Sequence, residues 1–328
     1  MKLIWKEMIL AALMGLVMPG AVLGLAASVD MPETVIEITT GVPTEVAAEE
    51  ETREEKPVFT VPILAGSEVV QMDLDAYLTG VVLAEMPASF EPEALKAQAV
   101  VARTYTMRAH TRGGKHESAA VCTDAACCQS YISPEDYLAA GGTQENVDKI
   151  RNAVGSTNGQ VLTYGGELIE ATYFSCSGGV TEDAAAVWGA DYPYLRSVES
   201  PGEEEAAYYS DTVVFSASEF EGALGRDLSG SPPSWFGLTT YTTGGGVASM
   251  EIGGTAYQGT TLRGLLGLRS TAFSVEADSG SVTITTRGFG HRVGMSQYGA
   301  DAMAVLGSSY AEILAHYYQG TSLDTLEN

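Results

Sequence analysis

Residues 77–105 constrain the fold of this 328-residue chain more than any other stretch. One carboxylate, Glu85, stands between the apolar run 81–84 and the pair Met86-Pro87. Burial among such neighbours disfavours ionisation and raises the pKa of a carboxyl group, which is how a protein makes a general acid. Strong helix formers follow over 92–108, and proline suits a first helical turn, so a helix is predicted to begin at Pro92.

The predicted helix carries two cations on one side. Lys96 and Arg103 are seven residues apart, so two helical turns bring them back to nearly the same face. A solvated helix face is the plain alternative for both. In a chain with 17 basic and 42 acidic residues, two aligned cations beside a candidate acid indicate a function.

The formal net charge of −25 restricts the partners of the protein. Such an excess of acid repels phosphate backbones and anionic lipid surfaces, so we expect no nucleic-acid partner. An uncharged or locally cationic ligand is compatible with this charge.

The first 57 residues differ in character from the rest. Lys2 and Lys6 precede residues 8–27, an uncharged run long enough to cross a bilayer as a helix. This pattern predicts a cytoplasmic tip and transmembrane anchor over 1–29, with the remainder exported. A cleaved signal peptide is the alternative, because small residues stand at 26–28. Residues 30–57 are acidic, lack aromatic residues and predict a disordered linker.

Hairpin and helix signals are mixed along residues 58–322 and predict one α+β domain, followed by a tail at 323–328. The strands are expected at 58–64, 69–74, 161–164, 168–173, 247–252, 272–277 and 282–286. Beyond the helix at Pro92, helices are expected before Glu85, over 144–154, from Ser216 onward, and over 296–306 and 310–317.

Three sequence blocks stand out from these signals. They are Glu85-Met86-Pro87 with Glu93–Ala99 and Ala102–Tyr105, then Tyr173–Gly179, and finally Gly288–Ala300. The blocks resemble the signatures of the stage II sporulation protein D family, and the resemblance covers residues 58–322. It implies a catalytic domain with a substrate cleft that acts on peptidoglycan glycan strands whose stem peptides have been removed.

The resemblance implies that Glu85 is the catalytic residue of a lytic transglycosylase. Glu85 would protonate the oxygen between N-acetylmuramic acid and N-acetylglucosamine, and its carboxylate would then take the proton of the muramyl 6-hydroxyl. That hydroxyl attacks within the same sugar and leaves a 1,6-anhydro end. A hydrolytic muramidase needs two flanking carboxylates, whereas the nearby acids resemble caps or surface groups: Asp73, Asp75, Glu91 and Glu93.

Further residues would bind substrate or support Glu85. They are Lys96, Gln98 and Arg103 on the long helix, Ser175, Ser177 and Gly178 in the second block, and His291, Gln297 and Tyr298 in the third. His291 would orient a carboxylate or a substrate hydroxyl, and a structural role in its glycine-rich loop is an equal alternative. The family usually has Gly-His-Gly-Val-Gly here, but this chain has Arg292 at the middle glycine.

The insertion at residues 115–131 carries a candidate metal site. His116, Cys122, Cys127 and Cys128 supply one nitrogen and three sulfur ligands, a set that structural zinc prefers. Relatives that the chain resembles include zinc binders with His and Cys in this insertion. A disulfide is the alternative, since exported cysteines are often oxidised. Cys176 is expected to be a buried small residue.

The sequence thus predicts a membrane-anchored, extracytoplasmic lytic transglycosylase that remodels the wall during sporulation engulfment. The resemblance also implies a cell-wall amidase and a membrane protein of the engulfment machinery as partners. A non-catalytic, glycan-binding amidase enhancer and a hydrolytic muramidase are the rival hypotheses.

Overall fold

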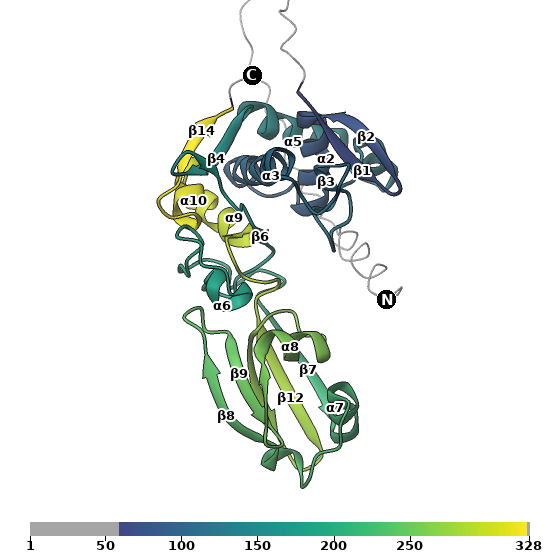
Figure 1. Ribbon diagram of the computed structural model, residues 1–328, viewed down its shortest axis with the longest axis vertical. Helices are drawn as coiled ribbons and strands as arrows, with labels where there is room; N and C mark the ends of the chain where they lie inside the picture. Colours follow the sequence, from purple (N-terminus) through teal and green to yellow (C-terminus); the bar gives the residue numbers. More distant parts are fainter. Residues whose placement is uncertain (1–58, 327–328) are drawn as a thin grey trace, which may run out of the picture. The chain divides into compact units, whose positions relative to one another are not determined.

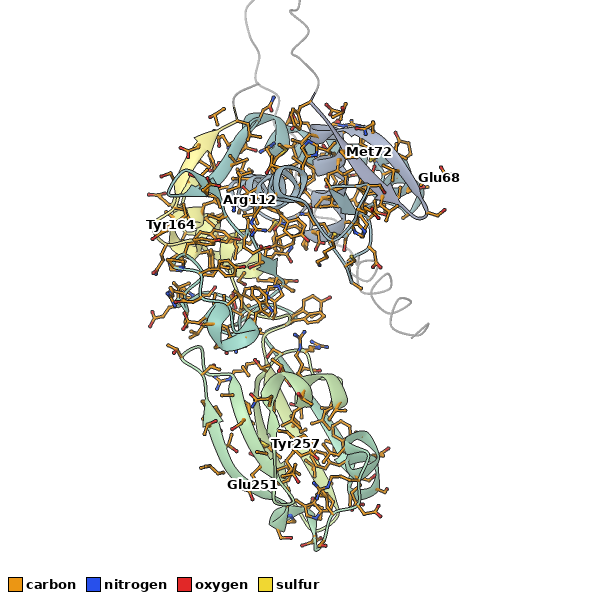
Figure 2. All side chains as sticks on the ribbon, in the orientation of Figure 1. Glu68, Met72, Arg112, Tyr164, Glu251 and Tyr257 are labelled. Carbon is orange, nitrogen blue, oxygen red and sulfur yellow. The ribbon has the colours of Figure 1, made fainter. Side chains whose placement is uncertain are left out.

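The computed structural model describes residues 59–326 (Figure 1). The predicted membrane anchor and acidic linker lie outside the described residues. Among residues 59–326, none of the helices combines the length and the apolar character that a membrane span requires. The described residues belong to one compact unit, and their buried side chains gather in two hydrophobic cores. Met72 packs against the first core and Tyr257 against the second (Figure 2).

The first core surrounds α3 (Pro92–Arg112), in which 12 of 21 residues are buried. A helix of this length is buried on so much of its surface because other helices pack against several of its sides. These are α2 (Leu74–Glu85), α5 (Gln144–Ser156), α9 (Gln297–Val305) and α10 (Tyr310–Tyr317). Two shorter helices are α4 (Pro134–Ala139) and α6 (Ala184–Trp188).

Small sheets border this core. One holds β1 (Thr60–Ala65), β2 (Glu68–Asp73) and β3 (Val121–Cys122), in the order β2-β1-β3. A second holds β4 (Gln160–Tyr164), β5 (Glu167–Leu168) and β14 (Ser322–Thr325), in the order β14-β4-β5. In the third, β6 (Tyr173–Phe174) pairs in parallel with β13 (Met295–Ser296). This last pairing joins the second and third sequence blocks.

The second core lies among two antiparallel sheets. Their strands are β7 (Ser210–Ser216), β11 (Ala272–Ala277) and β12 (Ser281–Arg287), and β8 (Phe236–Tyr241), β9 (Val247–Ile252) and β10 (Thr255–Gln258). The accompanying helices are α7 (Ala217–Leu224), α8 (Gly259–Leu265) and the short η1 (Pro232–Ser234). Phe220 of α7 stacks on Trp235 with a centroid distance of 5.9 Å, which fastens that helix to the core.

The mixture of helices and small sheets confirms the α+β prediction for the described residues. The expected strand at 168–173 is wrong in its extent, because β5 ends at Leu168 and β6 pairs with β13. The strand β14 pairs with β4 beyond residue 322, where the domain was expected to end.

Candidate active site

Glu85 is the last residue of α2, and its position follows from the local sequence. Asp73 begins the helix by accepting a 2.8 Å hydrogen bond from the N–H of Ala76. Proline at 87 disfavours helical angles in the residue before it, and Met86 accordingly has φ −130° and ψ 135°. The helix therefore stops at Glu85.

A hydrogen bond from the main chain of Ser130 holds the Glu85 carboxylate. The N–H of Ser130 donates to Oε1 at 2.6 Å, and the hydroxyls of Ser130 and Tyr173 also lower the pKa of the carboxyl group. Burial is the largest influence on the pKa of Glu85 and raises it above the ordinary 4.5, while the polar groups of Ser130 and Tyr173 act in the opposite direction. Glu85 thus combines a raised pKa with a fixed orientation, as a general acid requires.

Residues 129 and 130 connect Glu85 to helix α3. Gln129 is buried, donates from Nε2 to the Tyr173 hydroxyl at 3.2 Å and accepts from the hydroxyl of Thr106 at 3.0 Å. Both Gln129 and Ser130 directly follow the cysteines of the insertion. The insertion therefore supplies contacts to Glu85 and Tyr173, which no spacing in the sequence predicted.

The insertion brings its four candidate ligands together. One donor atom from each of His116, Cys122, Cys127 and Cys128 lies within 4.8 Å of the others. Nε2 of His116 is 3.6 Å from Sγ of Cys127 and 3.5 Å from Sγ of Cys128, and the two sulfurs are 3.8 Å apart. Sulfur ligands at ~2.3 Å around tetrahedral zinc would be separated by about 3.8 Å, so this donor set fits such an ion.

The four cysteines are free thiols, without a disulfide. Cys176 stays outside the cluster, is fully buried, and donates to Oε2 of Glu203 at 3.4 Å. The prediction that it is a buried small residue is confirmed.

The acids near Glu85 in sequence have other partners. Asp73 caps α2, Asp75 pairs with Arg103 at 3.3 Å, and Glu93 pairs with Lys96 at 2.6 Å. Glu91 uses its main-chain N–H to bind Oδ1 of Asp301 at 2.7 Å. Among residues 59–326, none of these four acids has a hydrogen bond to the groups that hold Glu85.

His291 joins the third block to β6. Its Nδ1 accepts the N–H of Val293 at 3.1 Å, and its ring packs against Phe174 of β6 with a centroid distance of 5.6 Å. Burial, with the positive charge of Arg263, lowers the pKa of His291 to about 4. The ring is therefore neutral at neutral pH and packs against the residue that follows Tyr173.

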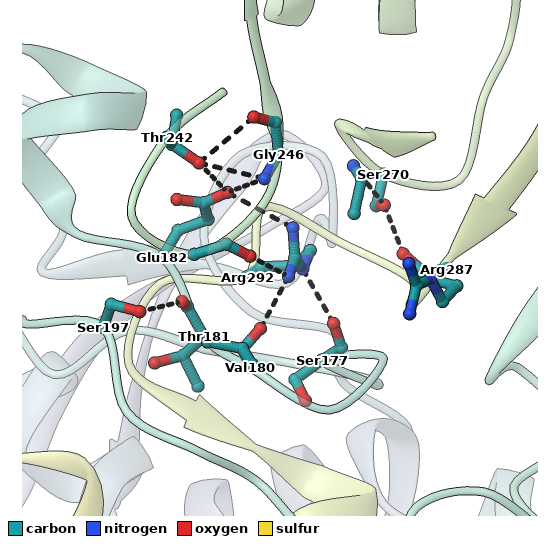
Figure 3. A network of polar contacts seen from close by, with 12 residues as sticks. Ser177, Val180, Thr181, Glu182, Ser197, Thr242, Gly246, Ser270, Arg287 and Arg292 are labelled. Atoms are coloured by element: carbon teal, nitrogen blue, oxygen red, sulfur yellow. Dashed lines mark hydrogen bonds and ion pairs between the residues drawn. The ribbon is translucent and has the colours of Figure 1, made fainter. Parts of the chain in front are cut away.

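Arg292 adopts a backbone conformation that favours glycine and compensates with its side chain. Its φ is 66°, and it is the only residue other than glycine with a positive φ among those the structure describes. The buried guanidinium donates to the carbonyls of Ser177, Val180 and Gly244 at 2.7, 2.7 and 2.8 Å (Figure 3). It also pairs with buried Glu182 at 3.2 Å.

Glu182 extends this network to the turn between β8 and β9. Its Oε1 accepts from the hydroxyl of Thr242 at 2.7 Å and from the N–H of Gly246 at 3.0 Å (Figure 3). The pair Arg292–Glu182 thus fastens the third block to the β8–β9 turn. These bonds explain why arginine stands at position 292, where the family usually has glycine, because only a long cationic side chain provides them.

The second block surrounds a buried carboxylate, Glu203. Oε2 of Glu203 accepts the N–H and hydroxyl of Ser177 at 2.9 and 2.7 Å, and the N–H of Gly178 at 2.9 Å. Gly178 has no room for a side chain, because a Cβ would lie 2.8 Å from the nitrogen of Gly288. The carbonyl of Ser175 accepts the N–H of Tyr298 at 3.0 Å. These observed contacts of Ser175, Ser177 and Gly178 are structural.

The three polar residues of α3 lie in different surroundings. Lys96 pairs with Glu93 and lies 5.9 Å above the ring of Tyr310. Buried Arg103 donates to the carbonyls of Val154 and Thr157 at 3.1 and 2.8 Å, which caps the end of α5. Gln98 is buried, and neither amide atom has a partner among the described residues. A role beside Glu85 stays a prediction for these three residues.

Gln297 and Tyr298 open helix α9. The amide nitrogen of buried Gln297 has no partner in the part of the chain that the structure covers. Tyr298 packs edge-on against Phe90 with a centroid distance of 5.0 Å, near the start of α3. Their predicted sugar contacts remain predictions.

Two cavities of the described structure have linings that do not include Glu85. One of about 450 Å³ is lined by residues including Gly178, Tyr209, Tyr241, Arg287 and Arg292. The other, of about 780 Å³, lies between α3 and α5 and includes Lys96 and Lys149. The predicted cleft around Glu85 therefore stays a prediction.

Known proteins resemble this chain over most of its length. The family model described as SpoIID, stage II sporulation protein, matches residues 65–164. Stage II sporulation protein D of Bacillus amyloliquefaciens is 41% identical over 285 residues, which cover 85% of this chain and 82% of that protein. Its counterpart in Bacillus subtilis is 42% identical over 280 residues, or 83% of this chain and 81% of that protein.

A third relative carries a different name. The amidase enhancer of Bacillus subtilis is 31% identical over 304 residues, which cover 75% of this chain and 40% of that protein. The similarity thus reaches proteins that are named for two different roles.

Proposed function

Because the chain belongs to the stage II sporulation protein D family, we propose that it is a lytic transglycosylase of peptide-stripped peptidoglycan strands. The observation that carries the proposal is the environment of Glu85. This buried carboxyl group has a raised pKa, and the N–H of Ser130 fixes its orientation. A role in sporulation and a general capacity for cell-wall modification follow from the family, and the specific reaction is the proposed part.

Glu85 performs both proton transfers in the proposed reaction. The protonated carboxyl gives its proton to the glycosidic oxygen while the bond from that oxygen to C1 of the muramyl residue breaks. The carboxylate then takes the proton of the 6-hydroxyl as O6 bonds to C1, which gives a 1,6-anhydro sugar and restores the acid. The N–H of Ser130 and the hydroxyl of Tyr173 stabilise the carboxylate between the two transfers.

Zn²⁺ is the metal we propose for the cluster of His116, Cys122, Cys127 and Cys128. The ion would hold the insertion in one conformation. Four protein ligands leave no position open for water, so its role is structural. The residues that directly follow the cysteines, Gln129 and Ser130, are the ones that contact the tyrosine and the acid.

The sequence and the family support the proposed location and partners. Residues 8–27 anchor the protein in the cell membrane, and the domain that begins near residue 58 acts outside it during engulfment. An amidase that removes the stem peptides supplies the substrate, and a membrane protein of the engulfment machinery is a further partner.

The test is to incubate the full chain with peptide-stripped glycan strands and analyse the strand ends by mass spectrometry. We expect 1,6-anhydro ends from the unaltered protein and none from Glu85→Gln. Reducing ends without anhydro sugar would contradict the proposal and indicate a hydrolytic muramidase.

An amidase-enhancing role is the second candidate function. Its support is the 31% identity to the protein named amidase enhancer. If this role is correct, strands stay intact in the same assay, and an added cell-wall amidase releases stem peptides faster.

A further inference from the structure

A large aromatic side chain lies exposed next to the supports of Glu85. Trp188 ends the short helix α6 and is 43% exposed. Its ring packs on His291 with a centroid distance of 5.1 Å and an interplanar angle of 58°. His291 also packs against Phe174, the residue after Tyr173. The hydroxyl of Tyr173 accepts from Nε2 of Gln129, and the next residue, Ser130, donates to the Glu85 carboxylate. These contacts connect the acid to an exposed indole.

The histidine beneath Trp188 is held firmly. Its Nδ1 accepts the N–H of Val293 at 3.1 Å, and Phe174 packs edge-on against the ring with a centroid distance of 5.6 Å. A neutral, fixed imidazole supports one part of the indole and leaves the rest open to solvent. Exposed aromatic rings on rigid supports offer apolar area at little cost in conformational entropy, and such rings commonly line ligand sites.

The positive charge of Arg263 in α8 acts on the same histidine and lowers its pKa. It is half-buried, and its Nε donates to the carbonyl of Leu268 at 3.4 Å. Within residues 59–326 it forms no ion pair, whereas Arg269, six residues later, pairs with Asp211 at 3.1 Å. In a chain with 42 acidic residues, an arginine left without an acidic partner is available to an anionic group of a ligand.

We propose that Trp188 and Arg263 form a saccharide subsite beside Glu85, in which the indole receives the apolar face of a sugar ring and Arg263 binds the lactyl carboxylate of a muramyl residue. The inference rests on the proposed function, since a glycan strand is the assumed ligand. A stem peptide consumes the lactyl carboxylate in an amide bond, so this charge exists only on stripped residues. Arg263 therefore contributes selectivity for stripped strands.

The test measures binding separately from cleavage. The full chain with Glu85→Gln is titrated calorimetrically with two probes of equal length, a peptide-stripped glycan strand and a chito-oligosaccharide, which has no lactyl group. For Trp188→Ala we expect about tenfold weaker binding of both probes, and an intermediate loss for Trp188→Phe. For Arg263→Gln we expect about tenfold weaker binding of the stripped strand alone.

A matched control is Tyr241→Ala, which removes an aromatic side chain that is 61% exposed on β8. This variant should bind both probes normally, and an equal loss here would overturn a localised site. Unchanged affinity in Trp188→Ala would refute the contact between the indole and a sugar ring. Equal effects of Arg263→Gln on both probes would refute the contact between Arg263 and the lactyl carboxylate. If wild-type protein leaves strands intact but binding depends on Trp188, the proposed function fails and the subsite stands.

Discussion

The main-chain N–H of Ser130 donates a 2.6 Å hydrogen bond to Oε1 of Glu85. Ser130 is two residues beyond Cys128, whose Sγ lies 3.5 Å from Nε2 of His116. The candidate metal cluster and the candidate acid are thus joined through three consecutive residues. The conformation of the insertion decides whether this donor reaches the carboxylate.

Loss of the metal should therefore slow strand cleavage. For Cys128→Ser, and for protein treated with a chelator, we expect loss of bound zinc and about tenfold slower formation of anhydro ends, as for changes in groups that support metal sites. Metal content is measured by atomic emission and cleavage by mass spectrometry. Cys176→Ser is the control, because Cys176 lies outside the cluster, and it should retain zinc. Full activity in metal-free protein would contradict this prediction.

Glu85 should make the thermal stability depend on pH. Because burial raises its pKa above 4.5, the folded state keeps this proton to higher pH than the unfolded state does. The stability contributed by the protonated form is complete below pH 4.5 and is lost as the pH rises through the folded pKa. Glu85→Gln does not titrate, so its Tm relative to wild type should increase over that range. Calorimetry at several pH values tests this, and a constant difference in Tm would refute it.

His291 should make the stability depend on pH in the opposite sense to Glu85. Burial lowers its pKa from 6.5 to about 4, so between these values the unfolded state binds a proton that the folded state does not. Stability is then lost as the pH falls through this window. His291→Gln should lose less stability than wild type between pH 6.5 and 4, as measured by urea unfolding. His110→Gln, which alters an exposed histidine, is the control substitution.

Local sequence signals were sufficient for the elements that hold Glu85. Proline at 87 and at 92 marks where α2 ends and where α3 begins, and both boundaries are properties of a few adjacent residues. The four metal-ligand candidates were recognised because their residue types already suggest the chemistry. Such features do not depend on distant parts of the chain.

The contacts of Glu85 could not be predicted in the same way. Ser130 and Tyr173 are 45 and 88 residues away in sequence, and one contributes only a main-chain N–H, which every residue except proline has. Arg103 illustrates the reverse case, since its place on the helix was predicted but its guanidinium caps α5. Helical periodicity predicts which side chains share a face, and tertiary packing decides what that face meets.

Replacing Arg292 with the glycine that the family usually has at this position should lower the free energy of unfolding. Arg292→Gly removes a strained positive φ, which costs a side-chain-bearing residue about 1–2 kcal/mol. The same change leaves the Glu182 carboxylate buried without its cationic partner, which typically costs about 3–5 kcal/mol. The second effect is larger, so we expect a net loss of about 2–3 kcal/mol in the free energy of unfolding, measured with urea.

The double variant Arg292→Gly with Glu182→Gln separates the two effects. A neutral amide is cheaper to bury than an unpaired carboxylate, and Gln can still accept from Thr242 and Gly246, so part of the lost stability should return. A cycle with both single variants then gives the coupling energy of the pair. If Arg292→Gly proves as stable as wild type, the guanidinium contacts contribute no more than the relieved backbone strain, and the loop holds its conformation without them.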